Sequence, residues 1–307
     1  MLVVFGSISV DFVFSLPHLP RKRETVWSEG GRAEPGGKGA CQAVAAARDG
    51  ASVTLIGAVG QDVLADGALT GLKRAGVDLR HVVRAPASTG RAAVLVDPEG
   101  YTMVAADRGA NQCARAGQVP DGMLGPGTTL LLQMETEPAE NVALIGRTRR
   151  RGARIILNLS PPRVIDSEAL RAVDLVIGDS QELAWAGEHL GTGNNPASLY
   201  ALLGVTAVRM MGAQGAEAMS SDGFLHMRAL PVGVRDTTGA ADCFTGVLAA
   251  ALARGADLPQ GLRRAAVAAA LSTTRIGAQG SFPNASDINA ALPRAQHPSS
   301  EEAEVTD

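Results

Sequence analysis

The sequence predicts an α/β fold in which a doubly wound, mostly parallel sheet is flanked by helices and carries a small β-sheet lid. Short apolar runs rich in β-branched residues alternate with helical patterns through most of the 307 residues. Several helical patterns end at a glycine, as before Gly50, Gly76 and Gly152. Two regions, at about residues 11–34 and 89–107, hold extended runs with no helix between them. The alternation favours a parallel sheet covered on both faces, and the two exceptions favour a separate small sheet.

The elements of the body follow from these patterns in chain order. Each strand is a short run of Val, Ile, Leu or Met, and each helix is a longer Ala-rich or amphipathic segment. Strands are expected at residues 2–8, 53–59, 129–133, 154–159, 175–177 and 205–210. Helices are expected at residues 38–49, 63–75, 139–151, 239–254 and 259–275.

The lid is expected to consist of four strands inserted into the body. They are expected at residues 11–16, 24–33, 90–96 and 101–106, and the turn Asp-Pro-Glu-Gly joins the last two. We expect this sheet to lie over the carboxyl edge of the main sheet, where ligands of open α/β sheets bind. Residues 1–297 are then a single domain, and residues 298–307 are expected to be a disordered acidic tail.

Composition argues against several classes of partner. The net charge of -3 and the pI of about 6.0 give no reason to expect nucleic-acid binding. No run of about 18 apolar residues exists that would predict a membrane span. The three cysteines are odd in number and widely spaced, so disulfides and a cysteine zinc site are not expected, and a reducing cytoplasm is the default location.

The segment Asp-Thr-Thr-Gly-Ala-Ala-Asp-Cys-Phe-Thr-Gly at residues 236–246 is the most informative motif. A helix that begins in Gly-Ala-Ala presents free amide groups and the positive end of its dipole, which suits a phosphate. Asp242, in the first turn, is placed to accept a proton from a hydroxyl beside that phosphate. The alternative is that Asp242 only complements the helix dipole. The coincidence of small residues, an acid and a long apolar helix favours phosphoryl transfer to an alcohol.

Two further motifs precede helices or follow strands. Gly-Gly-Lys-Gly-Ala at residues 36–40 opens a helix and allows close backbone approach to a ligand. It is not a Walker A loop, because Arg32 occupies the first glycine position and Gly39 follows the lysine. Ser9 and Asp11 share one face after the first strand, where a carboxylate can bind vicinal hydroxyls. Their alternatives are a capped turn and a turn-forming aspartate.

With these residues in place, the chain resembles the PfkB carbohydrate kinases, and their ribokinase-like members most closely. Residues 6–11 look like the family's opening sugar-binding strand, and residues 36–47 and 236–246 look like its two signatures. The resemblance extends from about residue 2 to about residue 293. Shorter matching segments lie at residues 133–135, 179–182, 212–215 and 275–281.

The resemblance implies a ribokinase-like fold and an ATP-dependent sugar kinase that transfers the γ-phosphoryl of MgATP to a primary hydroxyl of a pentose or related sugar. Asp242 would be the base, and the anion hole would be formed by Gly239, Ala240 and Ala241. The sugar would be bound by Ser9, Asp11, Gly37, Lys38, Cys41 and Glu135. The nucleotide would be bound by Asp179, Glu182, Gly212 and Gly215, with Glu182 acting on Mg²⁺ through water. A monovalent cation, expected to be K⁺, would be held by Asp236, Thr238, Ser272, Arg275, Gly277 and Ser281.

Four positions depart from the usual ribokinase pattern. Ser9 and Cys41 stand where ribokinases usually carry Asn, so the sugar pocket loses two amide side chains. Asp179 replaces another Asn and adds negative charge near Mg²⁺ and ATP. Ala241 replaces the glycine before the catalytic Asp, and its Cβ would cost about 1–2 kcal/mol if that residue had a positive φ.

The sequence also allows two alternative functions and predicts an oligomeric state. One alternative is a nucleoside (adenosine-like) kinase of the same fold, with Phe12, Phe14 and Trp27 as an apolar surface for the base. Another is a catalytically decayed sugar-binding protein, motivated by Ala241 and Asp179. A Rossmann oxidoreductase is disfavoured because no G-x-G-x-x-G follows the first strand. The unpaired edges and apolar face of a lid predict a homodimer that forms through it.

Overall fold

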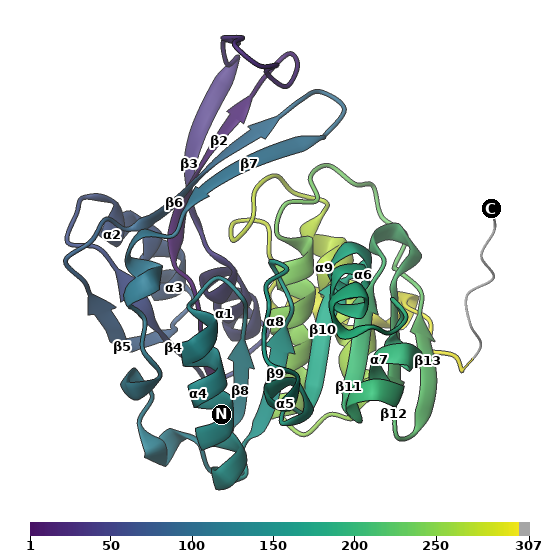
Figure 1. Ribbon diagram of the computed structural model, residues 1–307. Coiled ribbons are helices and arrows are strands. Elements are labelled where there is room, and N and C mark those ends of the chain that lie inside the picture. The colour runs from purple at the N-terminus through teal and green to yellow at the C-terminus, as the bar shows by residue number, and fades with distance from the viewer. Residues whose placement is uncertain (301–307) are drawn as a thin grey trace.

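The body is built on a nine-stranded sheet in the order β13-β12-β11-β10-β9-β8-β1-β4-β5. A computed structural model of the chain describes residues 1–300 (Figure 1). All neighbouring strands of this sheet are parallel except β12 and β13, which add an antiparallel edge. The strands are β1 (Leu2–Phe5), β4 (Val53–Val59), β5 (Asp78–Arg84), β8 (Thr129–Leu132), β9 (Arg154–Asn158), β10 (Leu175–Asp179), β11 (Thr206–Met210), β12 (Ala216–Ser220) and β13 (Gly223–Met227).

Helices cover both faces of this sheet, which confirms the predicted doubly wound α/β class. Alternate residues of β1 point to opposite faces, because side chains alternate along a strand. Leu2 and Val4 pack with α1, α8 and α9, whereas Val3 and Phe5 pack with α4, α6 and α7. The helices are α1 (Lys38–Arg48), α2 (Leu64–Ala68), α3 (Thr70–Arg74), α4 (Pro138–Arg151), α5 (Ser167–Arg171), α6 (Ser180–Leu190), α7 (Pro196–Leu203), α8 (Ala240–Ala253), α9 (Leu258–Ser272) and α10 (Ala285–Ala291).

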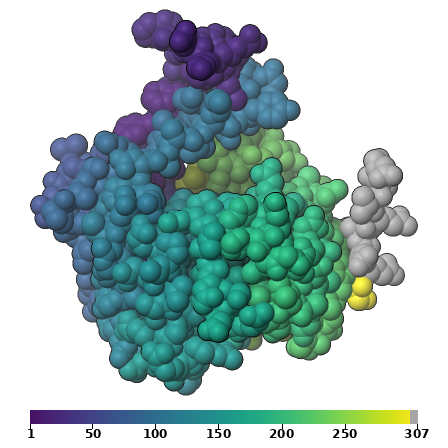
Figure 2. All heavy atoms as spheres, in the orientation of Figure 1, coloured from purple at the N-terminus to yellow at the C-terminus, as the bar shows by residue number. Residues whose placement is uncertain are grey.

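A second sheet of four strands, in the order β3-β2-β6-β7, forms the predicted lid. Its strands are β2 (Ser9–Ser15), β3 (Gly30–Gly36), β6 (Gly90–Val96) and β7 (Thr102–Asp107). Strands β2 and β6 are parallel, and the outer pairs are antiparallel. The lid rises from the carboxyl ends of the body strands and overhangs that end of the molecule (Figures 1 and 2).

Several elements differ from the predictions. The helix expected at residues 63–75 is divided into α2 and α3. The lid strand expected at residues 24–33 is β3, which begins at Gly30. Strands β5, β12 and β13 were not predicted, because their residues lack a continuous apolar or strictly alternating pattern.

The last described residues lie beside β13. Ser299 exchanges two backbone hydrogen bonds with His226, at 2.7 and 2.9 Å. Of the predicted acidic tail, residues 301–307 lie outside the described residues. Within residues 1–300, no helix has the length and apolar character needed to cross a membrane.

Candidate active site at the carboxyl edge of the sheet

The start of α8 has the geometry of an anion site. Gly239 precedes the helix with φ 76°, a left-handed conformation that favours glycine. A Cβ at Gly239 would also lie 3.1 Å from side-chain atoms of Ala278 and Phe282. The amide of Ala240 donates to the Thr237 carbonyl oxygen at 3.1 Å. Within the described residues, the amides of Gly239, Ala241 and Asp242 have no hydrogen-bond partner, so these three can receive an anion.

Ala241 lies within the first turn of α8 and does not have a positive φ. Its Cβ therefore causes none of the backbone strain that would follow if glycine were required there. This departure from the family pattern leaves the helix start intact.

Asp242 projects from this turn into a cluster of charged side chains. It accepts a hydrogen bond from Gln42 Nε2 at 2.9 Å through Oδ1. Burial raises the pKa of Asp242, the Lys38 ammonium and the Gln42 hydrogen bond lower it, and the carboxylates of Glu135 and Glu182 raise it again. The net direction is upward, as suits a carboxylate that accepts a proton during a reaction.

Lys38 and Glu135 come from different elements and meet at the start of α1. Lys38 is the first residue of α1, and its amide donates to Glu135 Oε2 at 3.0 Å. Ser7 also donates its hydroxyl to Glu135 Oε2, and it accepts from the amide of Gly39 at 3.2 Å. Burial alone would lower the pKa of Lys38, but the carboxylates of Asp242, Glu135 and Glu182 raise it to about 12. Lys38 is therefore a permanent cation in the site.

Asp11 lies at the base of the lid, on β2. Its Oδ1 accepts from the Ser9 hydroxyl at 2.9 Å. Its carboxyl group packs against Gly36, where a Cβ would be 2.1 Å from Oδ2. Burial raises the pKa of Asp11 to about 6, helped by Glu135, Asp242 and Glu34 and opposed by the Ser9 hydrogen bond.

Gly37 and Cys41 are the remaining two of the residues predicted to bind the sugar. Gly37 caps α1 with φ 89°, and a Cβ there would lie 2.9 Å from the Ser7 carbonyl oxygen and the Ser9 amide. The Cys41 side chain is buried, and its Sγ accepts from Gln279 Nε2 at 3.7 Å. Burial is the largest of the effects that raise the pKa of its thiol, which keeps it protonated.

A cavity of about 590 Å³ lies on the other side of the α8 start. Five predicted residues line it: Asp179, Gly212, Gly215, Ala240 and Ala241. Its remaining wall is mostly apolar and comes from α9, α8 and the segment after β13, including Val232, Phe244, Ala266, Ala269 and Ala270. A mostly apolar cavity that ends at free amides suits a planar group with an attached phosphate chain.

Asp179 and Glu182 form a reciprocal cap at the start of α6. The Asp179 side chain accepts from the Glu182 amide, and Glu182 Oε2 accepts from the Asp179 amide, each at 2.8 Å. Asp179 lines the cavity, whereas Glu182 lies behind it and is nearly buried. Aspartate fills the usual Asn position here as a helix cap, and N-cap positions accept either residue.

Asp236 contacts two other residues of the predicted cation loop. This carboxylate accepts from the amides of Thr238 at 2.9 Å and Gly277 at 2.8 Å. Arg32 of β3 reaches within 3.8 Å of the same carboxylate. The hydroxyls of Ser272 and Ser281 bond to carbonyls of their own turns, and the Arg275 side chain is directed to Asp287. Asp236 thus joins the two chain segments that flank the α8 start.

Sequence reasoning missed Ser7, Gln42 and Gln133. Gln42 had a signal: apart from Cys41, it is the one side chain with polar atoms between Gly39 and Ala47, on a helix otherwise built from small apolar residues. Ser7 and Gln133 had none, because each acts through a partner that is distant in sequence.

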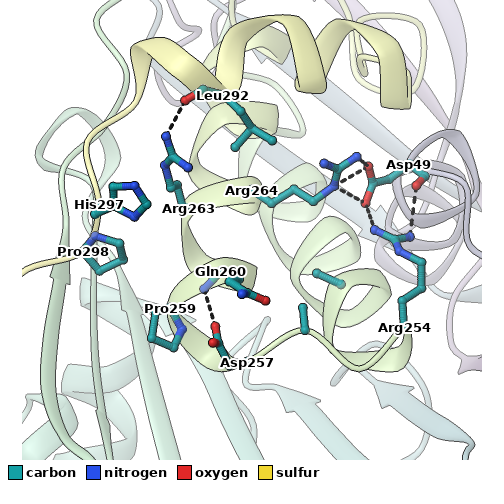
Figure 3. A pocket seen from close by; sticks show the side chains of 12 residues that line it. Asp49, Arg254, Asp257, Pro259, Gln260, Arg263, Arg264, Leu292, His297 and Pro298 are labelled. Atoms are coloured by element: carbon teal, nitrogen blue, oxygen red, sulfur yellow. Dashed lines mark hydrogen bonds and ion pairs between the residues drawn. The ribbon is translucent and has the colours of Figure 1, made fainter.

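A second cavity, of about 680 Å³, lies at the opposite end of α8 and does not resemble a catalytic site (Figure 3). Its charged groups are already paired: Asp49 lies between Arg254 and Arg264. Arg263 donates to the carbonyls of Leu292 and Ala295. None of the predicted site residues lines it.

Comparisons with known proteins agree with this geometry. The description "pfkB family carbohydrate kinase" matches residues 1–285. The chain is 31% identical to a ribokinase of Lactococcus lactis over 94% of this chain and 96% of that protein. It is 28% identical to a deoxyribokinase of Salmonella typhimurium over 95% and 98% of the two chains. A solved structure of Arabidopsis thaliana ribokinase, complexed with ribose and ATP, superposes with a TM-score of 0.84 at 26% identity, covering 95% of this chain and 98% of that one.

Proposed function

The chain belongs to the pfkB family of carbohydrate kinases, which transfer phosphate to an alcohol group, and we propose a specific reaction for it. In this reaction the γ-phosphoryl of MgATP is transferred to a primary hydroxyl of a pentose or related sugar. The observation that carries the proposal is the position of Asp242. It lies between free helix-start amides on one side and the cluster of Asp11, Lys38 and Glu135 on the other. A donor phosphate and an acceptor hydroxyl can therefore meet at this carboxylate.

In the proposed reaction, Asp242 accepts the proton of the sugar hydroxyl as its oxygen attacks the γ-phosphorus. The bond between that phosphorus and the bridging oxygen breaks, and ADP leaves with the electron pair. The amides of Gly239, Ala241 and Asp242 stabilise the charge on the transferring group, and Ala240 contributes its place in the turn. The Lys38 ammonium, held between carboxylates, adds positive charge to the same site.

The family implies a divalent cation and a monovalent cation. Mg²⁺ is expected to arrive bound to the phosphates of the nucleotide. Asp179 at the cavity wall and Glu182 behind it would hold its waters, and the ion would neutralise phosphate charge. The carboxylate of Asp236 and nearby carbonyls provide the oxygen ligands that suit K⁺, with Thr238, Ser272, Arg275, Gly277 and Ser281 contributing to this loop.

The sugar pocket offers fewer free polar groups than a pocket with two asparagines. The Ser9 hydroxyl is turned to Asp11, and the Cys41 sulfur is turned to Gln279. A sugar with fewer hydroxyls to satisfy is therefore a reasonable acceptor, and the similarity to a deoxyribokinase supports testing 2-deoxyribose beside ribose.

The two alternatives have less support. Trp27 is 85% exposed and Phe12 packs against the core, so the apolar surface expected for a nucleoside base is not assembled under the lid. The hypothesis of a catalytically decayed protein is based on Ala241 and Asp179. Ala241 lies in the first turn of α8 and Asp179 is the N-cap of α6, so neither residue strains the backbone.

The test is ADP release with ribose, 2-deoxyribose, fructose, ketodeoxygluconate and adenosine, with and without K⁺. Asp242→Asn is expected to lower kcat by about 10³-fold with the best sugar while ATP still binds, because general-base catalysis contributes roughly 10²–10⁴-fold. Wild-type turnover in this variant would remove Asp242 as the base. Turnover with adenosine alone would instead favour the nucleoside kinase, and sugar binding without phosphate transfer would favour the decayed protein.

We also propose a homodimer that forms through the lid and a reducing cytoplasmic location. The lid exposes Phe14, Met103 and Val104, and every residue of its edge strand β7 is exposed. All three cysteines are free, which suits a reducing compartment.

A further inference from the structure

Two buried glutamine side chains connect the interior of the sheet to Asp242. Gln42, on α1, donates its Nε2 to Asp242 Oδ1 at 2.9 Å. Gln133, directly after β8, donates its Nε2 to Gln42 Oε1 at 2.9 Å. Both glutamines have a relative exposure of 0%. Three elements that are distant in sequence therefore meet through this chain of hydrogen bonds.

The direction of this chain follows from Asp242. An ionised carboxylate only accepts hydrogen bonds, so Gln42 must present its NH₂ group to it. The Gln42 oxygen then faces Gln133, which must present its own NH₂ group in turn. Gln133 Oε1 is consequently left without a hydrogen-bond partner in the described part of the chain, packed against Gly6. Most buried carbonyl groups in native structures are hydrogen-bonded, so this unpaired oxygen calls for an explanation.

Close helix packing makes the bond between α1 and α8 possible. A Cβ at Gly246 of α8 would lie 2.3 Å from the Gln42 carbonyl oxygen and 3.0 Å from Ala45 Cβ. The two helix backbones therefore approach closely beside Gln42, one turn after Asp242. Lys38 precedes Gln42 by one helical turn and lies on the same face of α1.

We propose that Gln42, oriented by Gln133, is a positioning residue that fixes the Asp242 carboxylate so that Oδ2 faces the acceptor hydroxyl. This inference rests on the proposed role of Asp242 as base. The hydroxyl proton moves to Oδ2, while Oδ1 continues to accept from Gln42 as the carbonyl oxygen of the acid. The bond thus persists in both protonation states, and the proton leaves Oδ2 to solvent after product release.

Other charged or titratable groups near Asp242 also influence the pH dependence of kcat. Those groups are Lys38, Glu135, Glu182, Asp11, Cys41 and Cys243. None of them is changed in the variants below, so a moved pH profile reports the loss of the Gln42 hydrogen bond.

The test compares Gln42→Met, which keeps the side-chain length and removes the amide, with Gln133→Met and the control Gln118→Met. Gln118 donates to the backbone carbonyls of Gly57 and His81, apart from this chain. With ATP and D-ribose or 2-deoxyribose, kcat of Gln42→Met is expected to fall about 10–100-fold, because small misplacements of reacting groups cost up to about 10²-fold. Its KM for ATP should change less than about twofold, and the acidic limb of its kcat profile should move to higher pH. Gln133→Met should show the same changes to a smaller extent, and Gln118→Met should match wild type.

A measurement without turnover gives a second reading. The ¹³Cγ shift of Asp242 against pH should give a higher pKa in Gln42→Met, and a higher one still in Gln42→Glu, which keeps the shape and adds a carboxylate. Unchanged kcat and an unmoved titration in Gln42→Met would overturn the proposal. So would lower activity that follows thermal stability alone, with the titration unmoved. If Asp242→Asn keeps full turnover, the base assignment fails; if it is inactive while Gln42→Met behaves as wild type, only this inference fails.

Discussion

At the scale of single residues, Asp11 shows how the site changes a side chain's chemistry. The carboxyl group lies at the base of the lid with Glu135, Asp242 and Glu34 around it, and burial together with these charges raises its pKa to about 6. A group with an ordinary carboxyl pKa would be ionised throughout the physiological range. Asp11 therefore changes charge close to the pH at which the protein would work.

We predict that the KM for the sugar rises as the pH falls below about 6, by up to about tenfold per pH unit. Protonation removes the negative charge of Asp11 and turns one of its two acceptor oxygens into a donor, which weakens its binding of vicinal hydroxyls. Steady-state kinetics between pH 5 and 8 at saturating ATP measures this. In Asp11→Asn the inflection should disappear, and in Ser9→Ala it should move to higher pH, because the Ser9 hydrogen bond lowers the pKa. An inflection that survives in Asp11→Asn would contradict the prediction.

The same raised pKa has a consequence for stability. Because the folded state holds the Asp11 proton more tightly than the unfolded chain, stability falls as pH rises from about 3.8 through about 6, and the penalty is complete above that. Asp11→Asn is thus expected to unfold at the same or a higher temperature than wild type at pH 7.5, although it binds the sugar less well. A marked loss of stability would show that Asp11 has a structural role instead.

Local sequence predicts the residues of the candidate site, but it does not predict the connections between them. The two signatures predict roles for Lys38, Asp242 and the start of α8, because glycines at a helix start let an anion approach and a nearby carboxylate can accept a proton. The bond from Gln42 to Asp242 joins residues 200 positions apart, and no local pattern reports it. The engagement of the Ala240 amide by Thr237 is likewise a detail of turn geometry.

At the scale of elements, one buried carboxylate joins three helices. Asp49 caps the end of α1 and pairs with Arg254, after α8, and with Arg264 of α9 (Figure 3). Its side chain is completely buried, and Arg254 also donates to its carbonyl oxygen at 3.0 Å. Removing one member of such a group leaves the partners' charges uncompensated in the interior.

We predict that Asp49→Asn lowers the free energy of unfolding by about 3 kcal/mol. The melting temperature should fall by roughly 5–10 °C for a chain of this size. Calorimetry or denaturant titration measures the change, and kcat at 25 °C should be unaffected because this cluster lies at the far end of α8 from Asp242. The control is Asp66→Asn, which removes an exposed ion-paired carboxylate and should change stability by less than about 0.5 kcal/mol. Equal effects in the two variants would refute the buried role.

Elements were predictable where one pattern dominates. The buried parallel strands are continuous apolar runs, so β4 and β8 were found within a residue of their bounds. Strands β12 and β13 mix small, polar and apolar residues; β13 is only partly buried, whereas β12 is mostly buried although it contains Glu217 and Ser220. Their pairing comes from tertiary context that a local pattern does not contain.

At the scale of the whole molecule, the lid leaves apolar surface that the body does not cover. Met103 and Val104 on the edge strand β7 are 50% and 61% exposed, and Phe14 of β2 lies on the same small sheet. A long apolar edge of this kind favours association with another sheet.

We predict a mass of about twice 31.5 kDa in solution at micromolar concentration, and half of that for Val104→Asp, because a charge on the edge strand opposes burial of the lid. Light scattering coupled to size exclusion measures both masses. Val63→Asp places the same charge at an exposed apolar position on the body and should leave the dimer intact. A monomeric wild-type protein would refute lid-mediated assembly.

The two sides of the candidate active site come from different parts of the chain. Asp11, Lys38 and Glu135 precede α4, whereas the residues that line the 590 Å³ cavity and the start of α8 follow β9. On the proposed assignment of the sugar and nucleotide sides, a recombinant that exchanges only the first 137 residues with another member of the family should acquire a new sugar preference and keep its nucleotide. The exchange point of such a hybrid separates Gln42 from Asp242, and also Asp49 from Arg254 and Arg264, so these contacts must all remain compatible in a working hybrid.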